Sequence, residues 1–272
     1  MKKFLLLLLL LLLSYEIAYA GGAGFLTKLN ISEEDYEKML LENRKEIGWQ
    51  FLAAKHGEGE DKFKFYDSLI DLEFALRRGD IDVIVVPSVV ADYMLNVNRN
   101  FAFEGLENVK PVSLVFGFNK NDVERRDKFN SALKSMKEDG TLSKIIDDYL
   151  ITPEFDEPEP VKFENFDGAD TIRIAVTGDL PPIDLVSASG APAGFNTAVI
   201  AEIGRRLKMN IVLTDIDSGS RAAALVSGRV HAVFLYFQFL DSSLNFDAPD
   251  GVILSEPYYD FDKLVHIKLR NK

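Results

Sequence analysis

The sequence predicts an α/β protein built of two lobes, and three observations lead to this prediction. Apolar stretches of strand length alternate with helical patterns up to about residue 150, and the alternation restarts at Thr171. Residues 151–170, which are rich in proline and acidic side chains, separate the two parts. The 272 residues are also enough for two lobes of roughly 100 to 150 residues each. Because alternating strands and helices form parallel βαβ units, we expect a parallel sheet in each lobe.

The first part of the chain predicts strands and helices in turn. A short strand at Phe25–Thr27 is followed by the polar segment Asn30–Glu34, which is typical of a helix start, and this helix should end near Lys55. The other strands expected here are Phe63–Tyr66, Ile81–Val86 and Pro111–Phe118, and the other helices are Leu69–Arg78, Glu124–Glu138 and Leu142–Leu150.

The proline-rich stretch 151–170 has little apolar periodicity and predicts an extended linker. After it, strands are expected at 172–176, 211–214, 230–237 and 263–269, and helices at 197–208 and 221–226.

The first twenty residues predict an export signal. Two lysines precede the leucine-rich run 5–13, and Ala18–Ala20 has the Ala-x-Ala pattern of a cleavage site. A membrane anchor needs about 20 apolar residues, whereas Ser14 interrupts this run. We therefore expect cleavage after Ala20, no stable membrane insertion, and a periplasmic or secreted protein. The chain has no cysteine, so no disulfide framework and no lipid-modified cysteine at the cleavage site are expected.

Composition narrows the classes of partner. The formal net charge is −12, and removal of the signal makes it one unit more negative, because two lysines and one glutamate are lost. Such a surface repels nucleic acid phosphates and anionic lipids, so no nucleic acid partner is expected; the charge also serves solubility. The three histidines are scattered, and no metal site or cofactor is expected.

Several short motifs in a consistent order carry a family resemblance. After Thr171 these are Thr177–Pro182, Gly194–Asn196, Ser227–Val230 and Ser255–Tyr259. They resemble the first lobe of the periplasmic amino-acid-binding proteins of ABC importers, which are family 3 solute-binding proteins with a type II periplasmic binding fold. Leu76–Asp82 and Lys137–Leu142 resemble that family's second lobe and its closing helices.

The order of these motifs differs from that of the family, where the Gly-Asp-x-Pro-Pro lobe comes first. The sequence therefore resembles a circularly permuted member, and a slice of a tandem array is the alternative. In this interpretation the strands Val112–Phe118 and Lys263–Leu269 lie side by side as the hinge. The expected parts are a signal peptide (1–20), the second lobe (21–118), closing helices of the first lobe (119–150), the linker (151–170), the first lobe (171–262) and a hinge strand (263–272).

The resemblance implies a function without chemistry. It predicts a monomer that captures a small polar ligand, amino-acid-like or a derivative, and passes it to the membrane subunits of an ABC importer. A ligand-sensing receptor module is one alternative. A dehydratase-type enzyme on the same fold is another, but its candidate acid and base, Asp179 and Glu256, have no evident partner in the sequence.

Ligand contacts are expected where strands end, because in open α/β sheets the ligand lies beyond the carboxyl ends of the strands. Asp179 is interpreted as an acceptor for the ligand or as a cap of its turn. Tyr236 and Gln238 alternate along a strand and so share a face. The full set of predicted ligand-binding residues is Thr27, Asn30, Ser88, Thr177, Asp179, Leu180, Arg221, Tyr236 and Gln238.

Two departures from the family concern its charged anchors. The family holds the ligand's carboxylate with an arginine shortly after the strand that corresponds to 230–237, and residues 238–243 contain none. It holds the ammonium with an aspartate where Pro87 stands here. We therefore expect a ligand with less charge than a free zwitterion. Arg221 is either a replacement for the carboxylate anchor or a solvent-facing helix residue.

Overall fold

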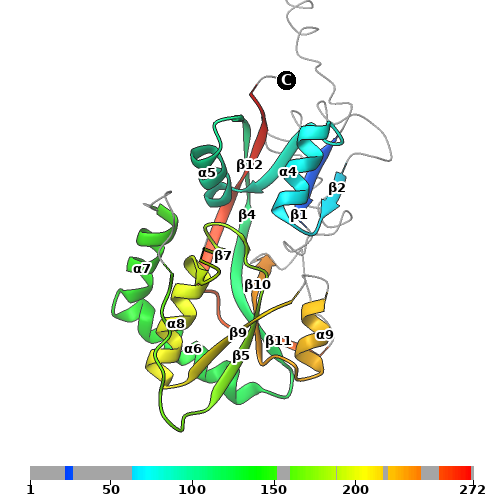
Figure 1. Cartoon of the computed structure of the whole chain (residues 1–272). Coiled ribbons are helices and arrows are strands. Elements are labelled where there is room, and N and C mark those ends of the chain that lie inside the picture. Colours follow the sequence, from blue (N-terminus) through cyan, green and yellow to red (C-terminus); the bar gives the residue numbers. More distant parts are fainter. Residues whose placement is uncertain are drawn as a thin grey trace, which may run out of the picture.

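The computed structural model describes residues 22–26, 63–151, 160–187, 189–216, 220–239 and 251–270. In these ranges one large sheet runs the length of the molecule, in the order β2-β1-β3-β12-β4-β10-β5-β9, with β11 paired to β4 (Figure 1). Helices α4 and α5 lie with β1 and β2 at one end, and helices α6 to α9 lie at the other. The predicted α/β class is confirmed.

The second lobe is built on three parallel strands in the order β2-β1-β3. Helix α4 is preceded by Ser68, whose hydroxyl accepts the Asp71 N–H at 3.1 Å, and it is followed by Gly79 with φ of 85°. Capping of this kind fixes both ends of a helix. The elements of this lobe are β1 (Ala23–Leu26), β2 (Phe63–Tyr66), α4 (Leu69–Arg78), β3 (Val83–Pro87) and α5 (Ser88–Val97).

The first lobe has the same strand order. Its parallel strands run in the order β9-β5-β10, which corresponds to β2-β1-β3 in the second lobe. In each lobe the parallel strand that comes first in the chain is the middle one, the next lies at the edge of the sheet, and the last lies nearest the strands that join the lobes. Its elements are β5 (Thr171–Val176), β6 (Asp179–Leu180), β7 (Asp184–Val186), β8 (Pro192–Ala193), α8 (Phe195–Leu207), β9 (Asn210–Asp215), α9 (Arg221–Val226), β10 (Ala232–Phe239) and β11 (Val252–Leu254). Strands β6, β7 and β8 form a separate small sheet.

Two long antiparallel strands join the lobes: β4 (Phe101–Asn119) and β12 (Tyr259–Leu269). Residues 101–108 of β4 pair with 263–269 of β12, and residues 112–118 of β4 pair with β10 of the first lobe. At the change of partner the Ser113 hydroxyl donates to Asp260 Oδ1 at 2.6 Å. We call this part of β4 and β12, residues 112–114 and 259–261, the crossing.

The two segments expected to form the hinge lie on neighbouring strands but do not pair with each other. The strands that contain Val112–Phe118 and Lys263–Leu269 are neighbours, but Val112 lies opposite Phe261 and Lys263 lies opposite Asn108. The segment 263–269 thus belongs with the second lobe, because it also pairs with β3. The residues that cross between lobes beside Val112 are 259–261.

Apolar packing continues through the crossing. The Phe116 ring, on β4, stacks on Tyr258 at 4.6 Å between centroids and meets Phe129 edge-on at 5.4 Å. Phe234 of β10 lies 5.7 Å away on the same ring. Since all four side chains are fully or almost fully buried, they form one core shared by β4, β10, α6 and the chain before β12.

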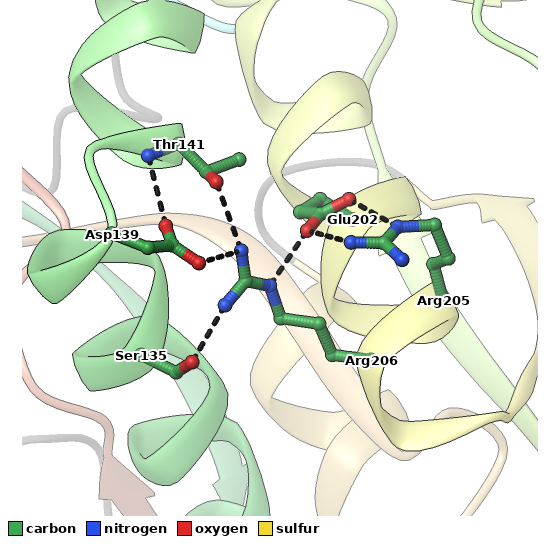
Figure 2. Close-up of polar contacts among 6 residues, drawn as sticks. All are labelled: Ser135, Asp139, Thr141, Glu202, Arg205 and Arg206. Carbon is green, nitrogen blue, oxygen red and sulfur yellow. Dashed lines mark hydrogen bonds and ion pairs between the residues drawn. The ribbon is translucent and has the colours of Figure 1, made fainter.

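Helices α6 (Val123–Glu138) and α7 (Thr141–Ile146) pack on α8 of the first lobe, and one arginine ties all three together (Figure 2). Arg206 of α8 donates to Ser135, Asp139, Thr141 and Glu202 at distances of 2.6 to 2.9 Å. The hydroxyl and amide of Thr141, and then Arg206, lower the pKa of Asp139 to about 2. We call these residues the Arg206 network; it attaches α6 and α7 to α8.

The structure differs from the sequence analysis at several places. Helix α5 was not expected, and β4 begins ten residues before the expected strand start at Pro111. Residues 160–170 of the predicted linker are free of helix and strand but are docked: the Val161 N–H donates to Pro192 O at 3.0 Å, and Phe163 packs on the core. The signal peptide, the helix expected to end near Lys55 and residues 152–159 lie outside the described ranges.

Candidate ligand-binding site

The carboxyl ends of the parallel strands in both lobes point toward the crossing. In the first lobe, Phe239 at the end of β10 pairs with Val112, and β5 runs parallel to β10. In the second lobe, Pro87 at the end of β3 pairs with Leu264, closer to the crossing than Ile84, which pairs with Ile267. The strand ends that bind ligands in open α/β sheets therefore face one another here.

The side-chain carboxylate of Asp184 forms hydrogen bonds with the turn after β5, residues 177–180. Asp184 Oδ2 accepts the backbone N–H groups of Thr177 and Gly178 at 3.0 and 3.2 Å and the Thr177 hydroxyl at 3.2 Å. Asp184 is only 2% exposed, whereas Thr177, Gly178 and Asp179 are half-buried. We call this arrangement the Asp184 turn. The sequence analysis missed Asp184, although a carboxylate shortly after a Thr-Gly turn is a recognisable acceptor for its N–H groups.

The chain beyond the turn is pinned to the start of α8. The Phe195 N–H donates to Pro182 O at 3.0 Å, and the Asn196 N–H donates to Ile183 O at 2.8 Å. Gly194, which precedes α8, has φ of 90°, and a Cβ there would lie 2.7 Å from Pro182 O. Only glycine fits this conformation and this close approach. The motif residue Gly194 therefore allows Pro182 and Ile183 to lie against the start of α8.

A second buried polar contact lies close to the same segment. The Tyr258 hydroxyl donates to Asn196 Oδ1 at 2.8 Å, and both side chains are buried. Burial raises the pKa of Tyr258 well above its usual value, and the charge of Asp184 adds to this effect. Tyr258 therefore stays protonated and works as a hydrogen-bond donor that ties the chain before β12 to α8.

Arg221 is not a solvent-facing residue. It is 5% exposed at the start of α9, and its Nη1 donates to the carbonyl of Phe234 on β10 at 2.8 Å. This contact ties the start of α9 to β10, the strand whose carboxyl end reaches the crossing. Of the two interpretations of Arg221, solvent exposure is wrong.

The other predicted site residues take different positions. Ser88 is half-buried and begins α5 directly after β3. Leu180 is fully buried in the apolar core, so neither its side chain nor its backbone is exposed. Tyr236 and Gln238 pair with Val115 and Ser113, which puts them on β10 beside the crossing. Thr27 and Asn30 lie outside the described residues.

Glu256, one of the two acids considered for an enzyme, lies beside α6 and not at the Asp184 turn. It lines an open groove of about 370 Å³ against α6, together with Lys134 and Lys137. Its backbone N–H donates to Asn130 Oδ1 at 2.8 Å. Among the described residues, no group of three or more histidine or acidic side chains could hold a metal ion. No helix in these ranges is long and apolar enough to cross a membrane.

The architecture is that of a two-lobed α/β protein with equivalent strand order in each lobe. Residues 172–238 match the model of the bacterial extracellular solute-binding proteins, family 3. The match runs from β5 through the Asp184 turn, α8 and α9 to β10, and over these residues it confirms the resemblance found in the sequence. Among curated proteins, none matches the chain.

Solved structures with a similar course of the chain come from several kinds of protein. The zinc-bound ligand-binding component of an ABC-type import system from Staphylococcus aureus is 12% identical, with 92% of this chain and 65% of that one covered and a TM-score of 0.43. The periplasmic aliphatic sulphonate binding protein SsuA from Escherichia coli is 13% identical, with 89% and 63% covered and a TM-score of 0.40. Full-length CbnR in complex with its target DNA is 7% identical, with 92% and 64% covered and a TM-score of 0.42. The chain thus spans just under two thirds of the length of these proteins.

Proposed function

We propose that this protein is an extracytoplasmic solute-binding protein that captures a small polar ligand between its lobes for an ABC importer. The observation that carries the proposal is the Asp184 turn, which lies within the family match and at the carboxyl end of β5, beside α4 of the second lobe. Backbone and side-chain groups held at such a strand end are the usual means of fixing a small ligand. Binding by closure of two lobes needs no reacting group.

The proposal includes export and a permuted chain. The twenty residues of the predicted signal would take the protein out of the cytoplasm, and the mature protein would work as a monomer. The attachment of α6 and α7 to the first lobe through the Arg206 network supports the permutation, since the family's closing helices are expected on that lobe.

The ligand in this proposal is amino-acid-like or a derivative with reduced charge. Pro87 ends β3 where the family's ammonium-binding aspartate is expected, and it is buried. Arg221 is the candidate partner for a carboxylate, because an arginine has five N–H donors in a rigid fork and its Nη1 contact with Phe234 O holds the group on β10. A carboxylate at Arg221 without a charged partner for an ammonium favours ligands whose nitrogen is an amide.

Ligand screening tests the proposal. We expect at least one compound among amino acids, oligopeptides, nucleosides and organic acids to raise the melting temperature of the purified protein, because a ligand that binds only the folded state stabilises it. A carboxylate-bearing ligand found in this way should bind Arg221→Met more weakly by about 2 to 5 kcal/mol in isothermal titration, since its carboxylate loses its partner.

Methionine retains most of the apolar bulk of the arginine, and the melting temperature of unliganded Arg221→Met reports any loss of folding. The matched control is Arg229→Met, an exposed arginine of the same lobe, which should bind like the wild type. If no compound of the four classes binds, the proposed function is wrong; unchanged affinity in Arg221→Met would remove only the arginine from the site.

A further inference from the structure

The ring of His231 carries its proton on one particular nitrogen. Its Nδ1 lies 3.0 Å from the backbone nitrogen of Arg173, whose N–H can only donate, so Nδ1 is the acceptor. Burial, and then the charges of Arg125 and Arg173, lower the pKa of His231, which keeps the ring neutral at pH 7 and above. A neutral imidazole whose Nδ1 accepts has its single proton on Nε2. His231 Nε2 is therefore a donor.

This donor lies beside a second donor. Arg173 Nη2 is 2.9 Å from His231 Nε2, and the nitrogens of a guanidinium carry protons but do not accept. Nη2 has two protons, of which one is donated to Gly228 O at 3.1 Å. Two N–H groups thus lie side by side, and neither can accept from the other. A group with two acceptor atoms would satisfy both at once.

The guanidinium of Arg173 is fixed in position but is not neutralised. Its Nε donates to Arg229 O at 2.8 Å, so together with the Gly228 contact it bonds the turn after α9 at two points. Within the described ranges, Arg173 forms no ion pair. Arg125 of α6 adds positive charge nearby, although Asp122 pairs with it, and Asp170 acts on Arg125. An anion at the two donors would therefore meet a preorganised cation.

The second lobe has a carboxylate at the equivalent place. In each lobe, three positions after a glycine of positive φ, a backbone N–H donates to the start of the lobe's first strand. In the second lobe this residue is Asp82, which donates to Gly22 O at 2.9 Å; in the first lobe it is His231, which donates to Arg173 O at 2.8 Å. The first lobe thus presents two donors where the second lobe has a negative side chain.

The donor pair lies at the end of the first lobe that is remote from the Asp184 turn. Arg173 is the third residue of β5, whose carboxyl end leads into that turn, and His231 directly precedes β10, which runs parallel to β5. Both side chains are half-buried, so solvent reaches them. A solute bound here would not compete with a ligand between the lobes.

We propose that Arg173 and His231 form a second binding site, for a small oxyanion of the phosphate or sulfate type that accepts the Nη2 and Nε2 protons with two of its oxygens. Hydrogen bonds between an arginine and such an anion are charge-assisted and strong. A free anion fits the site better than an anionic membrane surface, because the protein's net charge of −12 repels the latter. The inference is independent of the proposed function.

Nitrogen NMR of the histidine rings tests the donor pair in the wild-type protein. The chain has three histidines, and the signals of His231 are those that vanish in His231→Asn. In Tris chloride at pH 7.5 we expect the ring proton of His231 on Nε2, and we expect its resonance to shift when sodium phosphate is added but not when sodium chloride of equal ionic strength is added. A proton on Nδ1 would overturn the inference, as would an Nε2 signal that phosphate leaves unchanged.

Isothermal titration with sodium phosphate and sodium sulfate measures the role of the arginine. Arg173→Met should weaken binding of the tighter anion by about ten-fold or more, because the charged donor is lost. Arg78→Met is the matched control: it removes an exposed arginine of the second lobe and should stay within about two-fold of the wild type. Because phosphate and sulfate at high concentration stabilise proteins in general, the comparison between variants decides the result. Equal affinities for the two variants would overturn the inference.

Two substitutions of His231 separate its donor from its structural role. Asparagine can still accept the Arg173 N–H but has no group at the place of Nε2, so His231→Asn should bind phosphate about five-fold more weakly or worse. His231→Asp introduces the carboxylate found in the second lobe; it should abolish phosphate binding and melt at a higher temperature than His231→Asn in chloride buffer, since Arg173 then gains a partner. Unchanged phosphate affinity in His231→Asn, or an aspartate variant no more stable than the asparagine one, would contradict the proposal.

Vesicles distinguish the two sources of a phosphate group. The protein is sedimented with phosphatidylglycerol vesicles, and phosphatidylcholine vesicles are the control. We expect no binding to either at physiological salt. If phosphatidylglycerol vesicles bound the wild type but not Arg173→Met, while inorganic phosphate and sulfate had no effect, the ligand would be a lipid headgroup and the proposal of a free anion would be wrong.

Discussion

The two lobes share a strand order but are held together by different forces. In the first lobe, polar side-chain contacts join separate elements: the Asp184 turn, the Arg206 network and the Asn210 side chain, whose amide bonds the backbone of Phe166 and Ala169. In the described part of the second lobe, β3 is buried along its whole length, and α5 begins at Ser88 without a side-chain cap from the preceding residue, Pro87. Apolar packing is non-directional, whereas hydrogen bonds fix orientation. The lobe with the more directional contacts is the one that carries the candidate ligand turn.

The largest expected effect tests the apolar character of the second lobe. Leu72 of α4 is fully buried, and it packs so closely on β1 that a Cβ at Gly24 would lie 2.5 Å from its Cδ1. Leu72→Ala should lower the free energy of unfolding by about 2 to 5 kcal/mol, because the removed atoms leave a cavity. Urea denaturation measures this. Ile70→Ala, on the same helix but 62% exposed, is the control and should cost less than about 0.5 kcal/mol.

A smaller effect is expected from the polar contacts of the first lobe. Arg206→Met should cost about 1 to 2 kcal/mol, since several charge-assisted hydrogen bonds are lost at a site that is partly open to solvent. Arg205→Met is the matched control: it bonds the same Glu202 but is 51% exposed, so it should cost less than about 0.5 kcal/mol. If Arg206→Met destabilised the protein more than Leu72→Ala, the contrast between the lobes would be reversed.

The smallest effect is a pH dependence confined to the first lobe. Burial, together with Arg125 and Arg173, lowers the pKa of His231, whose Nδ1 accepts the Arg173 backbone N–H at 3.0 Å. The folded state thus favours the neutral ring, and the unfolded state binds the proton more readily. His231 should therefore contribute stability above pH 6.5 that is lost as the pH falls toward its lowered folded pKa.

Melting temperatures at pH 7.5 and 5.5 measure this contribution. His231→Asn should show a smaller drop between the two pH values than the wild type, and both proteins should change alike between pH 7.5 and 8.5, where the ring is neutral in either state. Equal drops in the acidic range would show that another group is responsible.

Much of the fold could be predicted, because most elements carry a local signal. Helix α4 has a serine cap, an apolar stripe and a glycine after its last turn, and all of these are visible in the sequence. Helix α5 was missed because its sequence continues the apolar run of β3, and periodicity alone does not separate a buried strand from a buried helix. The early start of β4 depends on pairing with β12, which is distant in the sequence.

The candidate site was predicted less well, for a related reason. The turn 177–180 followed from a motif and from the position of strand ends, but the carboxylate that orders it lies in the next short strand. Burial of Arg221 depends on β10, which no local pattern around Arg221 indicates. Docking of residues 160–170 depends on the amide of Asn210, more than forty positions further on. Contacts of this kind are made only after the chain has folded.

The crossing also has a consequence for the order in which the chain can fold. Ser113 and Asp260, which bond each other there, are 147 positions apart, and β12 comes last in the chain among the described strands. Strand β12 nevertheless occupies an interior place in the sheet, between β3 and β4. Pairing over such a separation slows folding, because a large loop must close before the contacts form. During synthesis, therefore, the second lobe is made first but cannot complete its sheet until the final strand has emerged.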